Sequence, residues 1–236
     1  MRLRLWSCFF GNHDHRRNLT AITAITAVAV MALCGLVAGI PLARADVAPG
    51  TTVTGDGYGV LVGAPDAPVQ LEIFCEPQCP HCAQFEAASD ADLARHLGSG
   101  QVAVTYRWLT FLDGKHDNDA SARAATALIA AADPTTPATA YQEFVADLYR
   151  HQDADGRSAT DLATMAAQNR VGPMAIARIA AALPVVDTAA MNTANRDRLT
   201  AANPDNPGTP TVYDLNAHRV VDTQDAAWLD KLVVSP

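Results

Sequence analysis

Three cysteines lie within eight residues of one another, and their spacing is typical of redox chemistry. Cys79 and Cys82 are separated only by Pro80 and His81, and Cys75 lies four residues before Cys79. Two cysteines with two residues between them can close a small disulfide ring at the start of a helix. Structural disulfides scattered along a chain do not produce such a cluster. The spacing therefore predicts a centre for thiol–disulfide exchange.

A helix start would also tune the first thiol of the pair. Unpaired backbone N–H groups and the helix dipole favour a negative charge there, and cysteines in such places have pKa values of ~3.5–7.5. We expect a lowered pKa for Cys79, with protonated His81 adding positive charge. A fall from about 8.5 to about 4 would stabilise the reduced form by ~4 kcal/mol at pH 7 and raise the potential by ~90 mV. We expect Cys82 to be more buried and to act as the resolving thiol.

The segments around the cysteines have the patterns needed to position them. Val69–Phe74 alternates and is rich in β-formers, which predicts a strand. A helix should begin at Cys79 or just after it, with Pro80 near its first position, and run toward His96. Val102–Leu109 predicts a second strong strand. The cysteines are therefore expected between a strand and a helix.

The rest of the chain predicts mostly helices. We expect a short strand at Tyr58–Val62 and a loop at 134–139. The five expected helices are Asp119–Ala132, Tyr141–His151, Ala159–Asn169, Pro173–Ala182 and Thr188–Ala201. A hairpin of Thr211–Leu215 and His218–Val221, turning at Asn216-Ala217, and a closing helix at Ala226–Val234 should follow. This order predicts an α/β sheet with an inserted block of helices.

The charge is unevenly distributed along the 236 residues. The formal net charge is −8, but residues 1–45 hold five arginines and one aspartate. The remainder therefore carries 12 basic and 24 acidic residues. Phosphate contacts need a basic face, so we expect no nucleic-acid partner.

The N-terminus has the pattern of a targeting segment. Basic residues between Arg2 and Arg17 precede an apolar run from Leu19 to Ile40, and Ala43-Arg44-Ala45 follows. A basic stretch, an apolar stretch and a small-x-small site describe a secretory signal. The run could also just span a bilayer and remain as an anchor. Both cleavage near Ala45 and anchoring leave residues 46–236 outside the cytoplasm.

The cysteine motif and two flanking motifs resemble a known family. Cys79-Pro80-His81-Cys82 is followed by Gln84-Phe85-Glu86, Gly63–Val69 precedes the strand, and Gly208-Thr209-Pro210-Thr211 lies near the end. Over roughly residues 58–234, the chain resembles the DsbA-type thiol–disulfide oxidoreductases of the thioredoxin-like superfamily. The resemblance implies an α/β thioredoxin-like fold with an inserted helical subdomain. Residues 46–57 are rich in Gly, Thr and Pro, which predicts a linker before a domain at 58–236 whose helical insertion covers about 115–200.

The resemblance also implies how the site works. Cys79 and Cys82 would be catalytic, and Pro80 and His81 would tune them. A cis peptide bond at Thr209–Pro210 would lie beside the cysteines, where the loop lines the substrate groove.

The chain departs from the family pattern at three positions. Many relatives have a buried acid six residues before the first active cysteine, but this chain has Ile73. Glu76, the nearer acid, or water would have to transfer the proton. Cys75 stands where relatives often have a small polar residue, and Pro77 replaces an aromatic residue. Two interpretations of Cys75 remain open, a buried thiol at the strand end and a third redox thiol.

Other interpretations of the cysteines fit less well. A zinc site needs four ligands, and no second cysteine pair follows. The three cysteines also match the spacing of radical enzymes with an iron–sulfur cluster, but those enzymes are mostly cytoplasmic and need a larger barrel. We expect no metal and no cofactor.

The predicted protein is an exported monomer that donates disulfides to reduced or misfolded exported proteins and is reoxidised by a membrane partner. Two alternatives remain. One is a reductase or isomerase with the same fold, and the other is a redox-inactive chaperone or binding module.

Overall fold

The computed structural model describes residues 50–234. The expected signal or anchor segment at residues 1–45 lies outside this range. None of the helices between residues 50 and 234 combines the length and the apolar character that a membrane crossing requires.

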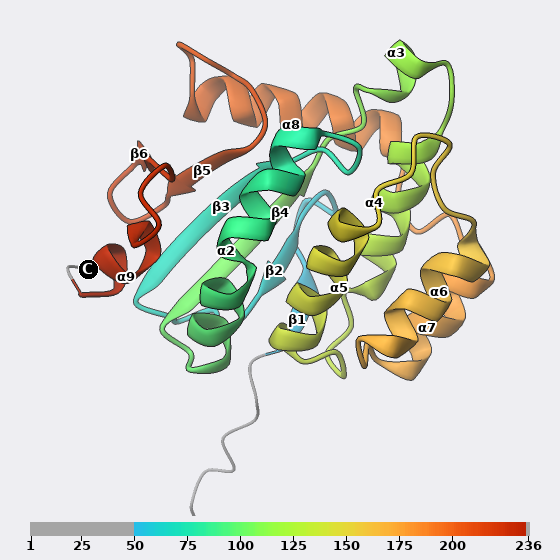
Figure 1. The fold of residues 1–236 in the computed structure, drawn as a ribbon, viewed down its shortest axis with the longest axis horizontal. Coiled ribbons are helices and arrows are strands. Elements are labelled where there is room, and N and C mark those ends of the chain that lie inside the picture. Colours follow the sequence, from blue (N-terminus) through green and yellow to red (C-terminus); the bar gives the residue numbers. More distant parts are fainter. Residues whose placement is uncertain (1–49, 235–236) are drawn as a thin grey trace, which may run out of the picture. The chain divides into compact units, whose positions relative to one another are not determined.

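A mixed β-sheet forms the centre of the described chain (Figure 1). The spatial order of its six strands is β1-β2-β4-β3-β5-β6. Only β3 and β4 pair in parallel, and the other neighbours pair antiparallel. The strands are β1 (Thr51–Val53), β2 (Val60–Val62), β3 (Val69–Cys75), β4 (Val102–Trp108), β5 (Thr211–Asp214) and β6 (Arg219–Val220).

Helices cover both faces of this sheet. α2 lies in front of it in Figure 1 and packs against α5, α8 lies behind it, and α4 to α7 gather at one side. The helices are α2 (Pro80–Gly98), α3 (Asp113–His116), α4 (Ala120–Ala131), α5 (Ala138–Arg150), α6 (Ala159–Gln168), α7 (Pro173–Ala180), α8 (Thr188–Ala202) and α9 (Trp228–Val234).

Alternation along β3 determines which side chains face which helices. Ile73 and Cys75 belong to the large core cluster that α2 and α5 complete. Phe74 points to the other face, where it packs with Leu109 and with Leu199 of α8. Because neighbouring strand residues point in opposite directions, Cys75 lies on the face that α2 covers.

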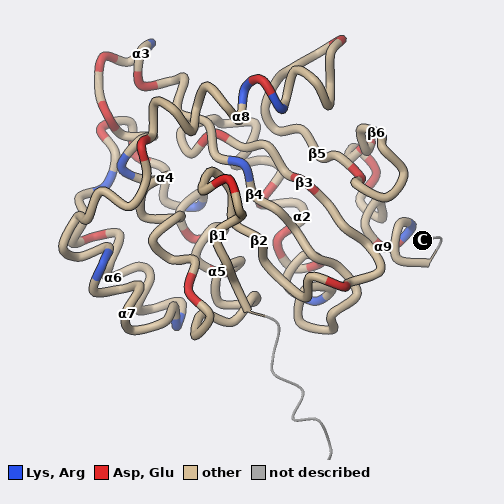
Figure 2. Tube along the Cα trace, turned by 180° about the vertical axis from the view of Figure 1, so that it is seen from behind, with Lys and Arg blue, Asp and Glu red and all other residues tan. Residues whose placement is uncertain are grey.

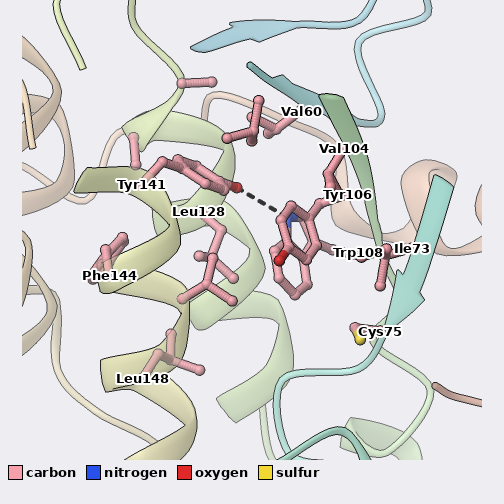
Figure 3. Packing of buried hydrophobic residues seen from close by; sticks show 14 of the residues in the cluster. Val60, Ile73, Cys75, Val104, Tyr106, Trp108, Leu128, Tyr141, Phe144 and Leu148 are labelled. Atoms are coloured by element: carbon pink, nitrogen blue, oxygen red, sulfur yellow. Dashed lines mark hydrogen bonds between the residues drawn. The ribbon is translucent and has the colours of Figure 1, made fainter. Parts of the chain in front are cut away.

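Aromatic side chains fill the core beside β4 (Figure 3). The rings of Tyr106 and Trp108 stack with centroids 5.1 Å apart, and the Trp108 indole N–H donates to the Tyr141 hydroxyl at 3.3 Å. Trp108 and Trp228 are 0% and 5% exposed. These rings belong to the same core cluster as Cys75, Cys79 and Cys82.

The expected linker contains a strand, which corrects part of the sequence interpretation. Residues 51–53 form β1 and pair with β2, so the ordered sheet begins before residue 58. The Gly- and Asp-containing segment after β1 is the turn between the two strands, where Gly57 adopts a φ of +78°. Turn residues between short strands have the same composition as a linker, which is why the pattern misled us.

Two further expectations needed correction in the region of the helices. α3 was not expected, because four residues are too few to show helical periodicity. α5 begins at Ala138, inside the expected loop at 134–139, because Pro137 acts as its N-cap and starts the helix earlier. The remaining expected helices and the hairpin are present with ends shifted by a few residues.

Acidic positions outnumber basic ones along the chain, and Lys and Arg are spaced apart among them (Figure 2). No continuous basic stretch is visible in this view of the described residues.

Candidate active site

The strand–turn–helix connection places the two predicted catalytic cysteines at the start of α2. The N–H of Cys79 donates to the Glu76 carbonyl at 3.0 Å, which closes the turn after β3. Cys79 is then the N-cap of α2, and Pro80 occupies the first helical turn. Proline is favoured there because the first N–H groups of a helix have no partner within it. The helix thus begins where the sequence predicted.

The two thiols differ in exposure less than expected. Cys79 is 7% exposed and Cys82 is 0% exposed, so only a small part of Cys79 reaches the surface. Pro80 and His81 lie between them on the exposed side of the first turn. All described cysteines are free thiols.

The loop before β5 lies against Cys79. The Thr209–Pro210 peptide bond is cis, and Thr211 pairs with Phe74 of β3. The Cys79 thiol donates to the Thr209 carbonyl oxygen, with 3.6 Å between sulfur and oxygen. Two segments 130 residues apart in sequence therefore form one site.

The Cys79 pKa is raised, so the expected lowering is wrong for this thiol pair. The hydrogen bond with the Cys82 thiol raises the pKa of Cys79, and burial adds to the effect. The N–H of Cys82, which donates to the Cys79 sulfur, acts in the opposite direction. A neighbouring thiol and a poorly hydrated position outweigh the helix start, because both penalise the thiolate.

A family model matches most of the described chain. The family model described as Thioredoxin matches residues 56–234. This chain belongs to the thioredoxin family.

Solved structures with the same fold include several thiol–disulfide oxidoreductases. The MdbA protein of Corynebacterium matruchotii has a TM-score of 0.65 and 22% identity, covering 78% of this chain and 91% of that one. DsbA from Mycobacterium tuberculosis, in its reduced form, has a TM-score of 0.59 and 20% identity, covering 76% and 94%. The chain thus has the thioredoxin-like fold of DsbA-type proteins, as the motifs predicted.

A curated relative shares more sequence but only over part of its length. The serine/threonine-protein kinase PknE of M. tuberculosis is 34% identical over 183 residues, covering 74% of this chain. The match covers 31% of the kinase, so this chain spans about a third of the length of that relative. Kinase activity is therefore not carried over to this member of the thioredoxin family.

The buried-acid position of the family holds Ile73, which is 0% exposed. Glu76 is the acid next to the thiols and is itself 0% exposed. Its carboxylate accepts from the Gln78 N–H at 2.7 Å and from the Ser121 hydroxyl. Burial raises the pKa of Glu76 to about 7, against the effect of these two hydrogen bonds. A carboxyl with this pKa can exchange a proton at neutral pH.

A second buried acid, Glu86, was not identified as a site residue from the sequence. It lies one turn after Cys82 on the inner side of α2 and is 1% exposed. Gln142 donates to its Oε2 at 2.9 Å, and the Tyr106 hydroxyl lies 3.3 Å from its Oε1. Burial raises the pKa of Glu86 to about 7. An acid on the apolar side of an amphipathic helix is the signal that could have identified it.

Two polar side chains from the end of α5 and beyond hold the turn before the thiols. The Gln152 side chain donates to the carbonyl oxygens of Pro77 at 2.9 Å and Cys79 at 3.1 Å. The Tyr149 hydroxyl donates to the Glu76 carbonyl at 3.2 Å. Sequence reasoning missed both residues, because their partners lie about 75 positions away.

No group of three or more His, Cys, Asp or Glu side chains between residues 50 and 234 is arranged to hold a metal ion. The chemistry available to the described site is that of its thiols and two carboxyl groups.

Proposed function

We propose that this protein is a thiol–disulfide oxidoreductase that exchanges disulfides with exported proteins through Cys79 and Cys82. The observation that carries the proposal is the thiol pair at the first turn of α2, with the Cys79 sulfur against the Thr209 carbonyl. The thioredoxin family match over residues 56–234 supports the same chemistry.

The exchange begins with the oxidised pair. A client thiolate attacks the Cys79 sulfur, the Cys79–Cys82 bond breaks, and Cys82 leaves as a thiolate that takes up a proton. A second client thiolate then attacks the client sulfur of the mixed disulfide. The client leaves with a disulfide, and the two electrons that it lost reduce Cys79 and Cys82 to thiols.

Substrate binding follows from the backbone beside Cys79. The backbone of Thr209, beside the Cys79 sulfur, would offer hydrogen-bonding groups to an extended segment of a client chain. An unfolded segment supplies such a backbone, and a folded protein does not. This favours reduced or misfolded exported proteins as the substrate class.

Proton transfer is assigned to Glu76. Its carboxyl is buried beside the turn that carries Cys79, and its pKa of about 7 lets it take up or release a proton at neutral pH. It would replace the acid that relatives have at the position of Ile73.

Export is supported by the sequence of residues 1–45, whose apolar run and small-x-small site describe a secretory signal. A cleaved signal would release the domain, and an uncleaved one would anchor it to the outer side of the membrane. In either case the thiols would meet clients outside the cytoplasm, where disulfides persist. A membrane partner would then accept the electrons.

The direction of exchange has two candidates. Disulfide donation is supported by the helix start, whose free N–H groups favour the thiolate of the reduced form. Reduction or isomerisation is favoured by the raised pKa of Cys79, since a protonated thiol removes that stabilisation. The reduction potential against a glutathione buffer decides between them, because a thiolate-stabilised pair has the higher potential.

The first test is Cys79→Ser. We expect this variant to lose disulfide transfer to a reduced, unfolded client, because the two remaining thiols of the site, Cys75 and Cys82, are 0% exposed and do not reach a client. Met174→Ser, at a 66% exposed position on α7, is the control and should transfer at the wild-type rate. Full transfer by Cys79→Ser would overturn the proposal.

A further inference from the structure

Cys75 is a third thiol that the exchange between Cys79 and Cys82 does not use. It ends β3 on the face that α2 covers and is 0% exposed. It belongs to the same buried cluster as Cys79 and Cys82. The question is whether it only fills space or lies where sulfur chemistry can reach it.

The contacts among the three thiols have a definite order. Cys82 is hydrogen-bonded to the thiol of Cys79 and also to the thiol of Cys75. Cys75 and Cys79 influence one another only through charge. Cys82 is therefore the central sulfur, with one possible disulfide partner on each side.

The surrounding elements keep this order in place. Cys75 is fixed by β3, whose last residue pairs with Trp108, and Cys82 is fixed in the first turn of α2. The Tyr149 hydroxyl is hydrogen-bonded to the Cys75 thiol and donates to the Glu76 carbonyl. The three sulfurs are thus held by rigid elements, not by a loose loop.

We propose that Cys75 is a third redox thiol, which exchanges with the Cys79–Cys82 disulfide to form a buried Cys75–Cys82 disulfide and a free Cys79 thiol. The proposal rests on the proposed function and deepens it by adding isomerase activity at the same site.

The exchange is balanced without any outside reagent. The Cys75 thiolate attacks the Cys82 sulfur, the Cys75–Cys82 bond forms, and the Cys79–Cys82 bond breaks. Cys79 leaves as a thiolate and takes up the proton that Cys75 gave up. The number of disulfides and the oxidation state of the protein do not change.

The rearranged form would act differently on clients. Its Cys79 can attack a wrong disulfide in an exported protein, but Cys82 is bonded to Cys75 and cannot resolve the mixed disulfide. Only another thiol of the client can release Cys79. The client then leaves with a rearranged disulfide and no net oxidation, which is isomerisation.

The wild-type test identifies which cysteine stays free in the oxidised protein. The full chain is oxidised with glutathione disulfide, quenched with acid and alkylated with N-ethylmaleimide in denaturant. It is then reduced and labelled with iodoacetamide. Fragmentation of the chymotryptic peptide 75–85, which carries all three cysteines, shows which label each one has. Cys8 and Cys34 fall outside this peptide.

We expect a population with maleimide on Cys79 and acetamide on Cys75 and Cys82. If maleimide is found only on Cys75 in every oxidised molecule, the inference is wrong, while exchange through Cys79 and Cys82 stands. Failure of the proposed function itself would be recognised by a different result, namely full disulfide transfer by Cys79→Ser.

A variant test uses the same peptide. Oxidised Cys79→Ser should form the Cys75–Cys82 disulfide, so its peptide loses the mass of two hydrogens. The double variant Cys75→Ala, Cys79→Ser is the control and should keep a free Cys82. A Cys79→Ser peptide that keeps both thiols after oxidation would contradict the contact order of the three sulfurs.

Discussion

At the scale of single residues, the thiols and carboxyls of this site are governed by what surrounds them. The pattern around Cys79 predicts a helix start, and a helix start alone lowers a thiol pKa. The raised pKa of Cys79 comes instead from the Cys82 thiol and from burial. How closely two thiols approach and how little water reaches them depend on packing, which residue types and spacing do not encode.

Glu86 gives a prediction of pH-dependent stability. Its pKa is 4.5 when exposed and about 7 in the folded protein. Between these values the folded state holds a proton that the unfolded state has lost, so stability falls as pH rises, by about 3 kcal/mol in total. Glu86→Gln cannot lose a proton. Its free energy of unfolding relative to wild type should therefore rise by about that amount from pH 4.5 to about 8.

The hydrogen bonds around Glu86 agree with a protonated carboxyl. The Tyr106 hydroxyl lies 2.6 Å from Gln142 Oε1 and 3.3 Å from Glu86 Oε1, and its single proton serves one of them. When the Tyr106 hydroxyl donates to Gln142, a protonated Glu86 carboxyl donates to the Tyr106 hydroxyl oxygen. Denaturant unfolding across this pH range is the measurement, with Glu143→Gln, whose side chain is 41% exposed and pairs with Arg170, as control. A pH-independent difference between Glu86→Gln and wild type would contradict the assignment.

At the scale of elements, the turn before the thiols depends on the chain that follows α5. Gln152 satisfies the carbonyl groups of Pro77 and Cys79, and Gln152→Ala removes both donors. We expect a loss of ~1–2 kcal/mol in unfolding free energy and faster alkylation of Cys79. Gln168→Ala, at an exposed position on α6, should change neither quantity. An unchanged alkylation rate in Gln152→Ala would show that this contact does not hold the site.

The helix behind the sheet supports β3 from the face opposite to α2. Leu199 of α8 is 2% exposed and packs with Phe74 and Leu109. Leu199→Ala should cost ~2–5 kcal/mol in unfolding free energy, because it leaves a cavity under β3. Leu183→Ala, at a 45% exposed position, is the matched control and should cost less than about 0.5 kcal/mol. Equal costs for the two variants would mean that α8 does not pack as described.

Elements with a strong local signal were predictable from the sequence, and elements defined by distant partners were not. β3, β4 and α2 were expected within a few residues because alternation and Pro80 mark them. β1 was missed because three residues pair only once β2 is beside them. Glu86 was missed because Tyr106 and Gln142, its partners, lie 20 and 56 positions away.

At the scale of the whole molecule, the fold brings the thiol pair and the Thr209 loop together on one sheet. β3 leads through a short turn to the thiol pair at the start of α2, and its antiparallel pairing with β5 brings the loop beside Cys79. This juxtaposition was expected only from the family resemblance, because nothing local links residues 79 and 209.

The central claim is that Cys79 forms the bond to the client and that Cys82 is its partner in the exchange. When the Cys79 thiolate attacks a client disulfide, Cys82 is the thiol that displaces the client by closing the Cys79–Cys82 bond. Cys82→Ser lacks that thiol, so mixed disulfides with disulfide-containing, unfolded clients should accumulate. Mass spectrometry of the trapped complexes identifies the bonded cysteine. The account predicts a client disulfide at Cys79 in Cys82→Ser, and a disulfide at Cys75 or no trapped client would contradict it.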